Sequence, residues 1–572
     1  MDIRNALKES IASSLNGLGI SVEVEKVPLE HPAELKNGDY SSGVALQYAK
    51  QAGSAPRVLA DKIAAALGTI DGIAKIEIAG AGFINFYLTP AALAEAVETA
   101  RKEDMWGSGA LNAGKEIMVE YTDPNPFKEF HIGHLMSNAI GESIARLMQF
   151  SGADVKRANY QGDVGPHVAK TIWGMEQNME EVSSFLNTGT VTEKPAFLLG
   201  KWYAFGANAY EKDENAKKKI DEINVLVYKI VAGETTHDQR EILISNMYKT
   251  GKAVSLAAFK EIYDILGTKF DYNFFESETA PLGVELVKKH PKVFVKSDGA
   301  TVYHGPHTRV FITSKGLPTY ETKELGLAEL KAETWPFDIS ITITAHEQRD
   351  YFEVVLAAMK EVLPDIASKI RHISHGMMRF AEGKMSSRTG NVITGESLLN
   401  DLVDAAKVRA KESRTTDAGK LSEEIAVAAV KYQILKQASG KDIIFDRERA
   451  LSLEGDSGPY LQYAHARAQQ IVEKAKEQNV AAKVDADVEP NDLVRLLHRF
   501  PESVEYAAAH TEPHLLTNYL LEFAAAFNSW YAQVHVLDGT PEAAHKVALV
   551  DAVRRTLKNG LWILGIPAPE RM

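Results

Sequence analysis

Residues 119–141 read VEYTDPNPFKEFHIGHLMSNAIG, and this stretch decides how the rest of the chain is interpreted. It continues an apolar run that is typical of a buried strand, and apolar residues then recur at helical spacing after a loop interrupted by two prolines. The letters HIGH stand at the start of this predicted helix, where unpaired N–H groups and the helix dipole attract phosphate. His131 and His134 are therefore predicted to face one side, and Gly133 leaves room for a flat ligand. The alternative is a helix start that carries two histidines by chance, because four-letter motifs recur.

A second segment, EGKMSSRTGN at 382–391, carries a lysine and several hydroxyl groups between two glycines. It lies between a predicted strand at 370–378 and a predicted helix at 397–407. Gly383 and Gly390 would allow such a loop to move over a bound ligand.

HIGH early and KMSSR late, in a chain that alternates strands and helices, resembles the class I aminoacyl-tRNA synthetases. More narrowly, VEYTDPNPFKEFHIGH is similar to the corresponding loop of arginyl-tRNA synthetases. The same family is indicated by the letters GDYSS and AGAGFINF near the N-terminus, by QYAHARAQQIVEKA at 462–475 and by the ending LGIPAPERM. These segments occur in the family's order, which is more specific than any one motif.

The resemblance implies an α/β fold in three parts. Residues 1–110 would form an N-terminal α+β domain that contacts tRNA, or, as an alternative, a stabilising cap without RNA contact. Residues 111–395 would form a Rossmann-like catalytic domain with a helical insertion at about 166–275. Residues 396–572 would form an all-helical anticodon-binding domain. Within the first part we expect a strand at 21–26 and a strand at 75–88 that bends at its glycines.

The activity implied by the resemblance is the ATP-dependent attachment of L-arginine to tRNA(Arg) through an arginyl-adenylate, with AMP and pyrophosphate as products. The family's loop KMSKS has a second lysine where this chain has Ser387, and Lys128 is expected to replace it; the alternative is an ordinary surface lysine. By match to the motifs, the ATP-binding residues are His131, Gly133, His134, Lys384, Met385, Ser386 and Ser387, and the catalytic ones are His131, His134, Lys384 and Lys128.

Recognition of arginine requires carboxylates, because a guanidinium is planar, always charged and rich in donors. The chain departs from the family at Glu324, where aspartate is usual, and at Thr122 and Asp123, where two serines are common. For Glu120 the alternative is a strand-end carboxylate paired with a lysine, and for Tyr320 a core aromatic. The family motifs assign arginine binding to Glu120, Asn125, Tyr320, Glu324 and Gln348.

Contacts to tRNA are expected from aromatic and arginine side chains that stack on unpaired bases. The alternative for each candidate is ordinary packing between helices. The candidates, chosen by type and region, are Tyr460, Tyr463, His465, Arg467 and Trp530.

The composition limits the remaining possibilities. The 572 residues contain no cysteine, which excludes disulfides and thiolate zinc sites and argues against the cysteinyl relatives of this class. A net charge of −13 argues against indiscriminate nucleic-acid binding but not against a structured RNA partner. No apolar run approaches the roughly 18 residues that span a bilayer. We expect a cytoplasmic monomer that uses ATP with Mg²⁺. We expect no metal site built by the protein itself, and we interpret His304 and His307 as structural residues.

Two other functions remain open from the sequence. A HIGH-type nucleotidyltransferase that adenylates a small metabolite would share the first motif, but such proteins are usually single-domain. A synthetase-like protein that only binds RNA or senses an amino acid would have lost its catalytic set, yet His131, His134 and Lys384 are present.

Overall fold

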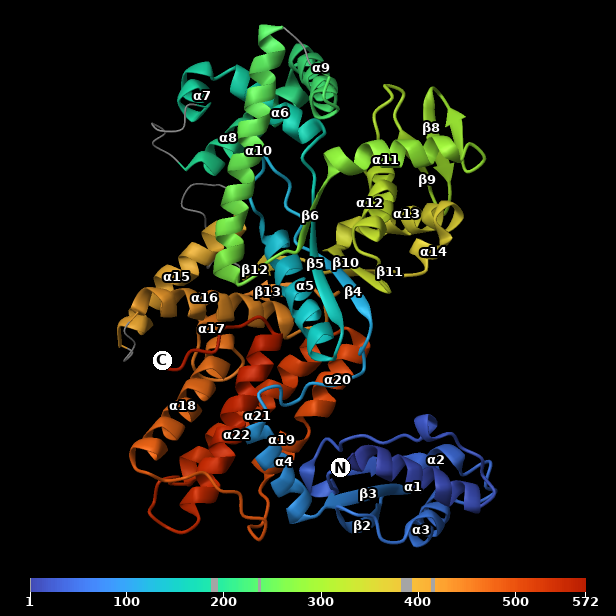
Figure 1. The fold of residues 1–572 in the computed structure, drawn as a ribbon, viewed down its shortest axis with the longest axis vertical. Helices are drawn as coiled ribbons and strands as arrows, with labels where there is room; N and C mark the ends of the chain where they lie inside the picture. The colour runs from blue at the N-terminus through green and yellow to red at the C-terminus, as the bar shows by residue number, and fades with distance from the viewer. Residues whose placement is uncertain (1, 187–193, 235–237, 382–392, 413–416) are drawn as a thin grey trace.

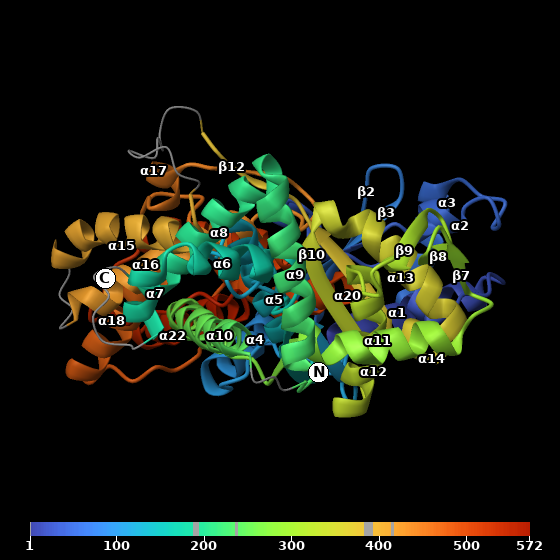
Figure 2. The ribbon, with the colours of Figure 1, turned by 90° about the horizontal axis from the view of Figure 1, so that it is seen from above.

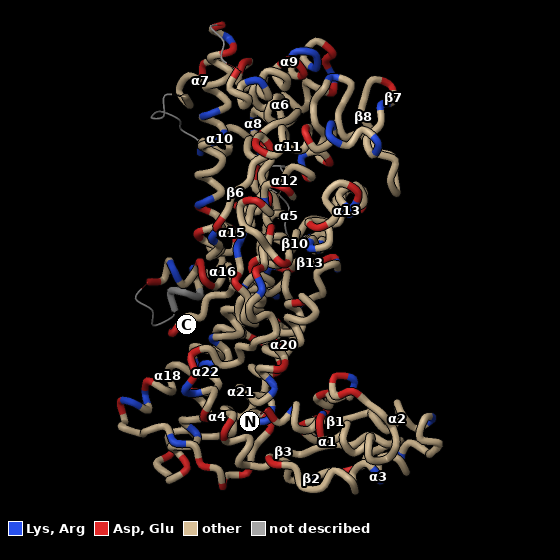
Figure 3. The backbone as a smooth tube through the Cα atoms, turned by 45° about the vertical axis from the view of Figure 1, so that its right-hand side comes forward, with Lys and Arg blue, Asp and Glu red and all other residues tan. Residues whose placement is uncertain are grey.

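The computed structural model describes residues 2–186, 194–234, 238–381, 393–412 and 417–572. The molecule is elongated, with the N-terminal part at one end and the helices of the insertion at the other (Figure 1). Seen from above, the central sheet is surrounded by helices from both the insertion and the C-terminal part (Figure 2). Lys and Arg alternate with Asp and Glu in every part of the chain (Figure 3), so the net negative charge is not confined to one domain.

The N-terminal part is an α+β unit with a three-stranded antiparallel sheet in the order β1-β3-β2. The predicted strand at 75–88 is a hairpin of two strands, because Gly80 and Gly82 adopt positive φ and reverse the chain. The predicted strand at 21–26 is wrong: Val24–Lys26 is a short 3-10 helix, and the Val22 N–H donates to the Asn16 side chain instead of a strand. The elements are α1 (Ile3–Gly17), β1 (Tyr40–Ser42), α2 (Val44–Tyr48), α3 (Pro56–Leu67), β2 (Ile73–Ala79), β3 (Phe83–Leu88) and α4 (Pro90–Lys102).

The centre of the catalytic part is a five-stranded, fully parallel sheet in the order β11-β10-β4-β5-β6. The strand order reverses between β4 and β10, and open α/β sheets bind ligands at the carboxyl ends of the strands at such a point. Helix α5 (Ile132–Phe150) follows β4 and is buried along most of its length. The strands are β4 (Glu116–Glu120), β5 (Asp154–Gln161), β6 (Tyr272–Phe275), β10 (Ile339–Ala345) and β11 (Ile370–His375).

Two groups of elements are inserted between these strands. The first is helical and has its own apolar core around Trp202; it comprises α6 (Pro166–Glu176), α7 (Met179–Leu186), α8 (Pro195–Lys212), α9 (Glu214–Val231) and α10 (Gln239–Leu266). The second packs around Phe311; it comprises α11 (Glu276–Lys289), β7 (Phe294–Ser297), β8 (Ala300–His304), β9 (Thr308–Ile312), α12 (Tyr320–Thr334), α13 (Arg349–Val362) and α14 (Pro364–Ala367).

The C-terminal part is helical apart from β13, which pairs in parallel with β12 of the preceding part. One continuous apolar core joins α5, the C-terminal helices and the N-terminal part. The remaining elements are β12 (Met378–Phe380), α15 (Gly395–Glu412), α16 (Ala418–Leu435), β13 (Ile443–Phe445), α17 (Arg447–Ala450), α18 (Gly458–Glu477), α19 (Asp492–His498), α20 (Phe500–His510), α21 (Pro513–Gln533) and α22 (Ala543–Ile563).

The N-terminal part is fixed to the C-terminal helices by residues of the GDYSS motif, 38–42. Arg495 donates to the Asp39 carboxylate at 2.7 Å, and both side chains are largely buried. The Tyr40 hydroxyl donates to the Glu502 carboxylate in α20. The motif therefore joins two domains.

Candidate active site

The loop between β4 and α5 lies at the point where the order of the parallel strands reverses. Glu120 ends β4 beside Thr342 of β10, and the next residues turn the chain sharply, with Thr122 and Asp123 at φ of 80° and 46°. The turn is tight because Tyr121 packs directly on α5: a Cβ added at Gly141 would lie 2.2 Å from the Tyr121 ring. Glu120 and the HIGH residues are thus held at the same edge of the sheet.

The two histidines of HIGH lie together at the N-terminus of α5. The His131 N–H donates to Nδ1 of His134 at 3.1 Å, and the two rings stack with their centroids 4.3 Å apart. Because Nδ1 of His134 accepts this bond, its Nε2 carries the proton in the neutral ring and is available as a donor.

The surroundings of HIGH are electropositive. Burial, followed by the charges of His131 and Lys128, places the pKa of His134 well below its ordinary value. Burial and Lys128 also lower the pKa of His131, and burial and Lys170 lower the pKa of Lys128. Groups that disfavour one another's protonation in this way favour a bound anion.

The residues that follow the KMSSR segment in the chain lie next to HIGH. Thr394 forms a β-bridge with His131, and the Gly395 N–H donates to the Phe130 carbonyl at 2.7 Å. The KMSSR segment itself comes directly after β12 in the chain. The predicted ATP-binding residues Lys384, Met385, Ser386 and Ser387 themselves lie outside the described residues.

The opposite side of the site is acidic. Lys331 of α12 donates to the buried Glu120 carboxylate at 2.6 Å. Glu324 is 5% exposed, and burial together with the charge of Glu120 raises its pKa to about 8. Burial and Glu120 also raise the pKa of Asp123 well above its ordinary value. Three carboxyl groups therefore share one nearby ammonium, which makes this region favourable for a further cation.

The other predicted arginine-binding residues surround the same edge of the sheet. The Asn125 side-chain oxygen accepts the Gly162 N–H at 3.1 Å. Tyr320, at the start of α12, hydrogen-bonds to Glu324, and burial and Glu324 raise its pKa well above the ordinary value. Gln348 ends the short 3-10 helix His346–Gln348, which follows β10.

Three family models match successive parts of the chain. Residues 97–447 match the family described as tRNA synthetases class I (R), catalytic domain. Residues 5–88 match the arginyl tRNA synthetase N terminal domain, and residues 461–572 match the DALR anticodon binding domain.

The chain belongs to the arginyl-tRNA synthetase family. It is 30% identical over 603 residues to the arginine–tRNA ligase of Treponema denticola and 29% identical over 598 residues to that of Clostridium perfringens, each match covering 100% of both chains. The structure of the Thermus thermophilus arginyl-tRNA synthetase has the same fold, with a TM-score of 0.79 at 24% identity and 100% coverage of both chains. The expected class I fold, with its N-terminal and helical C-terminal domains, is confirmed, and the two other functions left open by the sequence are set aside.

Two side chains at the acidic end of this arginyl-tRNA synthetase were not predicted to bind ligand. The sequence offered a reason to consider Asp123, since it departs from the family at this position. It offered no reason to consider Lys331, because a lysine in a helix is ordinarily solvated. Its burial matches the alternative interpretation of Glu120 as a carboxylate paired with a lysine.

The tRNA candidates in α18 and α21 fall into two groups. His465 is 2% exposed, and its Nδ1 bonds to the Pro569 carbonyl at 3.0 Å, so it fixes the C-terminal segment in the interior. Arg467 lies over the ring of Tyr463 at 4.6 Å and over the exposed ring of Tyr531 at 5.3 Å. Tyr460 and Trp530 are half-buried against the same core.

Neither a membrane-spanning helix nor a metal site is found in the described ranges. No helix there is long and apolar enough to cross a bilayer. The same ranges hold no group of three or more His, Asp or Glu side chains able to ligate a metal ion.

Proposed function

We propose that this arginine–tRNA ligase binds arginine with its guanidinium toward Glu120 and Glu324, while ATP phosphates lie against His131, His134 and Lys128. The observation that carries the proposal is the opposite electrostatic character of the two ends of one site. At one end, burial and a neighbouring carboxyl group raise the pKa values of Glu324 and Asp123. At the other end, burial and neighbouring basic groups lower the pKa values of His134 and Lys128. A substrate pair consisting of a guanidinium and a triphosphate fits this polarity.

In the first step, an arginine carboxylate oxygen attacks the α-phosphorus of ATP, and the bond to the bridging oxygen of pyrophosphate breaks. The α-phosphate oxygens gain charge as the new bond forms. Nε2–H of His134 and the ammonium of Lys128 are suited to stabilise this charge, since fixed donors cost no reorganisation at that moment. Lys384, with Ser386 and Ser387, would act on the leaving pyrophosphate. Gly133, without a Cβ, would let the nucleotide approach the start of α5.

In the second step, a ribose hydroxyl at the 3′ end of tRNA(Arg) attacks the carbonyl carbon of arginyl-adenylate, and AMP leaves with the electron pair of the mixed anhydride bond. The hydroxyl proton goes to the phosphate oxygen of the leaving AMP or to water. For the protein, this step is mainly one of alignment.

The helical C-terminal domain is proposed to bind the anticodon arm through the stack of Tyr463, Arg467 and Tyr531. An arginine between two aromatic rings offers stacking surfaces and a positive charge to unpaired bases. His465, held inside by Pro569, is assigned to packing.

Further properties are proposed from the family alone. The domains would be divided as 1–110, 111–395 and 396–572, and the protein would be a cytoplasmic monomer. Mg²⁺ would accompany ATP as a counter-ion. The described side chains around HIGH are imidazoles and ammonium groups, which suit phosphate oxygens, whereas Mg²⁺ prefers carboxylates and water; the ion would therefore be held mainly by the phosphates.

The test is aminoacylation of total tRNA with arginine, lysine or citrulline, together with pyrophosphate exchange with and without tRNA. We expect charging with arginine alone. Citrulline has nearly the shape of arginine but no charge, so its exclusion tests the acidic end directly. Charging with citrulline at a rate near that of arginine, or no charging with any amino acid, would contradict the proposal.

A further inference from the structure

A buried lysine stands where the catalytic part, the insertion and the C-terminal helices meet. Lys431 of α16 is 0% exposed, and its ammonium donates to the carbonyl oxygens of Leu266 at 2.7 Å and Gly565 at 2.8 Å. Among the residues that the structure describes, no carboxylate forms a hydrogen bond with this ammonium. Burial, followed by the charge of Arg146, lowers the pKa of Lys431 to about 7. An apolar residue of similar length would avoid the free-energy cost of burying an ammonium group. The presence of a lysine at this position therefore needs an explanation.

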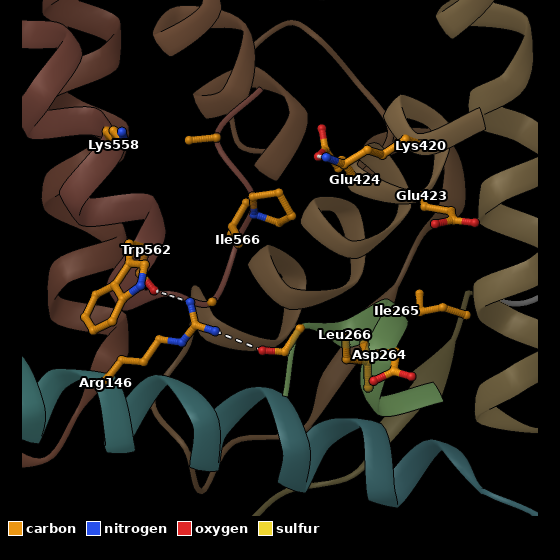
Figure 4. Close-up of a pocket in the computed structure, with 14 residues that line it drawn as sticks. Arg146, Asp264, Ile265, Leu266, Lys420, Glu423, Glu424, Lys558, Trp562 and Ile566 are labelled. Carbon is orange, nitrogen blue, oxygen red and sulfur yellow. Dashed lines mark hydrogen bonds and ion pairs between the residues drawn. The ribbon is translucent and has the colours of Figure 1, made fainter. Parts of the chain in front are cut away.

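Arg146 of α5 makes the matching contacts. Its guanidinium donates to the carbonyl oxygens of Trp562 at 2.9 Å and Gly267 at 3.0 Å. Figure 4 shows the side chain reaching from α5 between these two carbonyls, at the edge of a cavity of about 410 Å³.

The four carbonyls belong to the C-terminal ends of two helices from different parts of the chain. Leu266 is the last residue of α10 and Gly267 follows it, whereas Trp562 lies in the last turn of α22 and Gly565 lies just beyond that helix. The Trp562 carbonyl also accepts the Gly565 N–H at 2.9 Å. Carbonyls at the end of a helix carry the negative end of its dipole. Each of the two helix ends thus gives one carbonyl to Lys431 and one to Arg146.

Glu142 connects this junction to the HIGH helix and to the substrate site. It is buried in α5 and accepts from Nε of Arg146 at 2.6 Å and from Nε of Arg157 at 3.1 Å. It also accepts from the hydroxyl of Tyr121. Tyr121 is the chain neighbour of Glu120, and its carbonyl accepts from the Asn159 side chain at 3.0 Å.

We infer that Lys431 and Arg146 are positioning residues for aminoacylation: they hold α5 and the end of β4 in register with the ends of α10 and α22. A continuous series of hydrogen bonds runs from the last helix of the C-terminal domain through Arg146 and Glu142 to Tyr121, the residue beside Glu120. The inference rests on the proposed function, because it assigns the position of Glu120 and HIGH to this junction. Each of the two cations binds both helix ends, which fixes these ends relative to α5 and α16.

The experiment compares the full-length variants Lys431→Met and Arg146→Lys with wild type. Lys431→Met keeps the apolar stem and removes the ammonium, and Arg146→Lys keeps the charge but has only one nitrogen for three acceptors. The matched control is Lys420→Met, in the same helix α16 as Lys431; Lys420 lines the cavity and is paired only loosely with Glu424, at 3.8 Å.

Active-site titration separates positioning from folding, because it counts the competent molecules. Per titrated site, we expect the kcat of arginine charging to fall about tenfold in both variants and the KM for arginine to rise. The KM for tRNA is expected to stay within about twofold, since the proposed RNA-binding stack is elsewhere, and Lys420→Met is expected to match wild type. If Lys431→Met does not fold, Arg146→Lys decides.

A double-mutant cycle between Glu142→Gln and Lys431→Met tests whether the two residues act through one network. We expect the double variant to lose little more than the worse single variant. Losses that multiply, or a kcat per titrated site within twofold of wild type in both variants, would overturn the inference. Failure of the wild type to charge arginine would instead overturn the proposed function, so the two failures are distinguishable.

Discussion

Lys331 and Glu120 form a buried ion pair of 2.6 Å at the carboxyl end of β4, beside the strand order reversal of the sheet. The ammonium of Lys331 fixes the Glu120 carboxylate in one orientation at the end of the strand. A guanidinium that reaches Glu120 therefore meets an acceptor that is already oriented.

Removing this charge is expected to weaken arginine binding more than catalysis. Glu120→Gln should raise the KM for arginine about 10- to 100-fold, because a charge-assisted bond is lost and Lys331 is left without its partner. The measurement is steady-state charging with arginine varied. Glu116→Gln, an exposed position in the same strand, is the control and should match wild type. A change of less than threefold in Glu120→Gln would remove Glu120 from the arginine site.

The raised pKa of Glu324 makes arginine binding pH-dependent. With its pKa at about 8, Glu324 is mostly protonated at pH 7, and arginine, which stays charged, binds the carboxylate form. The KM for arginine should therefore fall as pH rises from 7 to 8, by up to about tenfold per unit, and level off above pH 8. Calorimetry in buffers of different ionisation enthalpy should show a proton released on binding.

One variant checks this interpretation. Glu324→Gln should abolish the pH dependence and the proton release. A pH profile unchanged in Glu324→Gln would assign the titration to another group.

The cationic end is expected to act on the chemical step. Lys128→Met should lower the rate of adenylate formation about 100-fold while leaving the KM for arginine within threefold, because its ammonium stands at the phosphate end. Rapid-quench measurement of the first turnover with tRNA present gives this rate. Lys201→Met, in the exposed face of α8 and ion-paired with Glu181 at 2.9 Å, is the control. Equal losses in both variants would mean that Lys128 contributes only general charge.

The GDYSS motif is expected to act through domain docking. Tyr40→Phe removes the hydrogen bond to Glu502, whose pKa is lowered to about 2 despite its burial, with His31 and Tyr40 as the main stabilising partners. The N-terminal domain should then be less firmly held, with a larger radius of gyration in solution scattering and a several-fold higher KM for tRNA. Tyr87→Phe, which removes a hydroxyl bonded only within the N-terminal domain, to Glu77 and to the Lys36 carbonyl, should change neither.

Sequence motifs located the site, and the structure showed which other residues contact its side chains. Glu120 and the HIGH histidines were predictable because one short segment carries them on a strand, a loop and a helix start. Lys331 could not be predicted as a partner of Glu120, because it lies in α12, far away in the sequence. The buried face of α12 is rich in charged residues, whereas the buried face of a helix is usually apolar. The hairpin at Gly80 and Gly82 was predicted only as a bend in one strand, because residue types do not show that its two halves pair with each other.

Secondary contacts of the site also lay beyond sequence reasoning. Arg146 and Lys431 belong to helices far apart in the chain, and their partners are backbone carbonyls, which leave no trace in residue type. Whether a cation meets two helix ends is decided by tertiary packing alone.

The apolar core shared by α5 and the C-terminal helices has a consequence for synthesis on the ribosome. The HIGH helix emerges early, but α16 and α22, which pack on it, follow far later in the chain. Until these helices are translated, the nascent catalytic domain exposes an apolar surface of the kind that makes folding intermediates prone to aggregation.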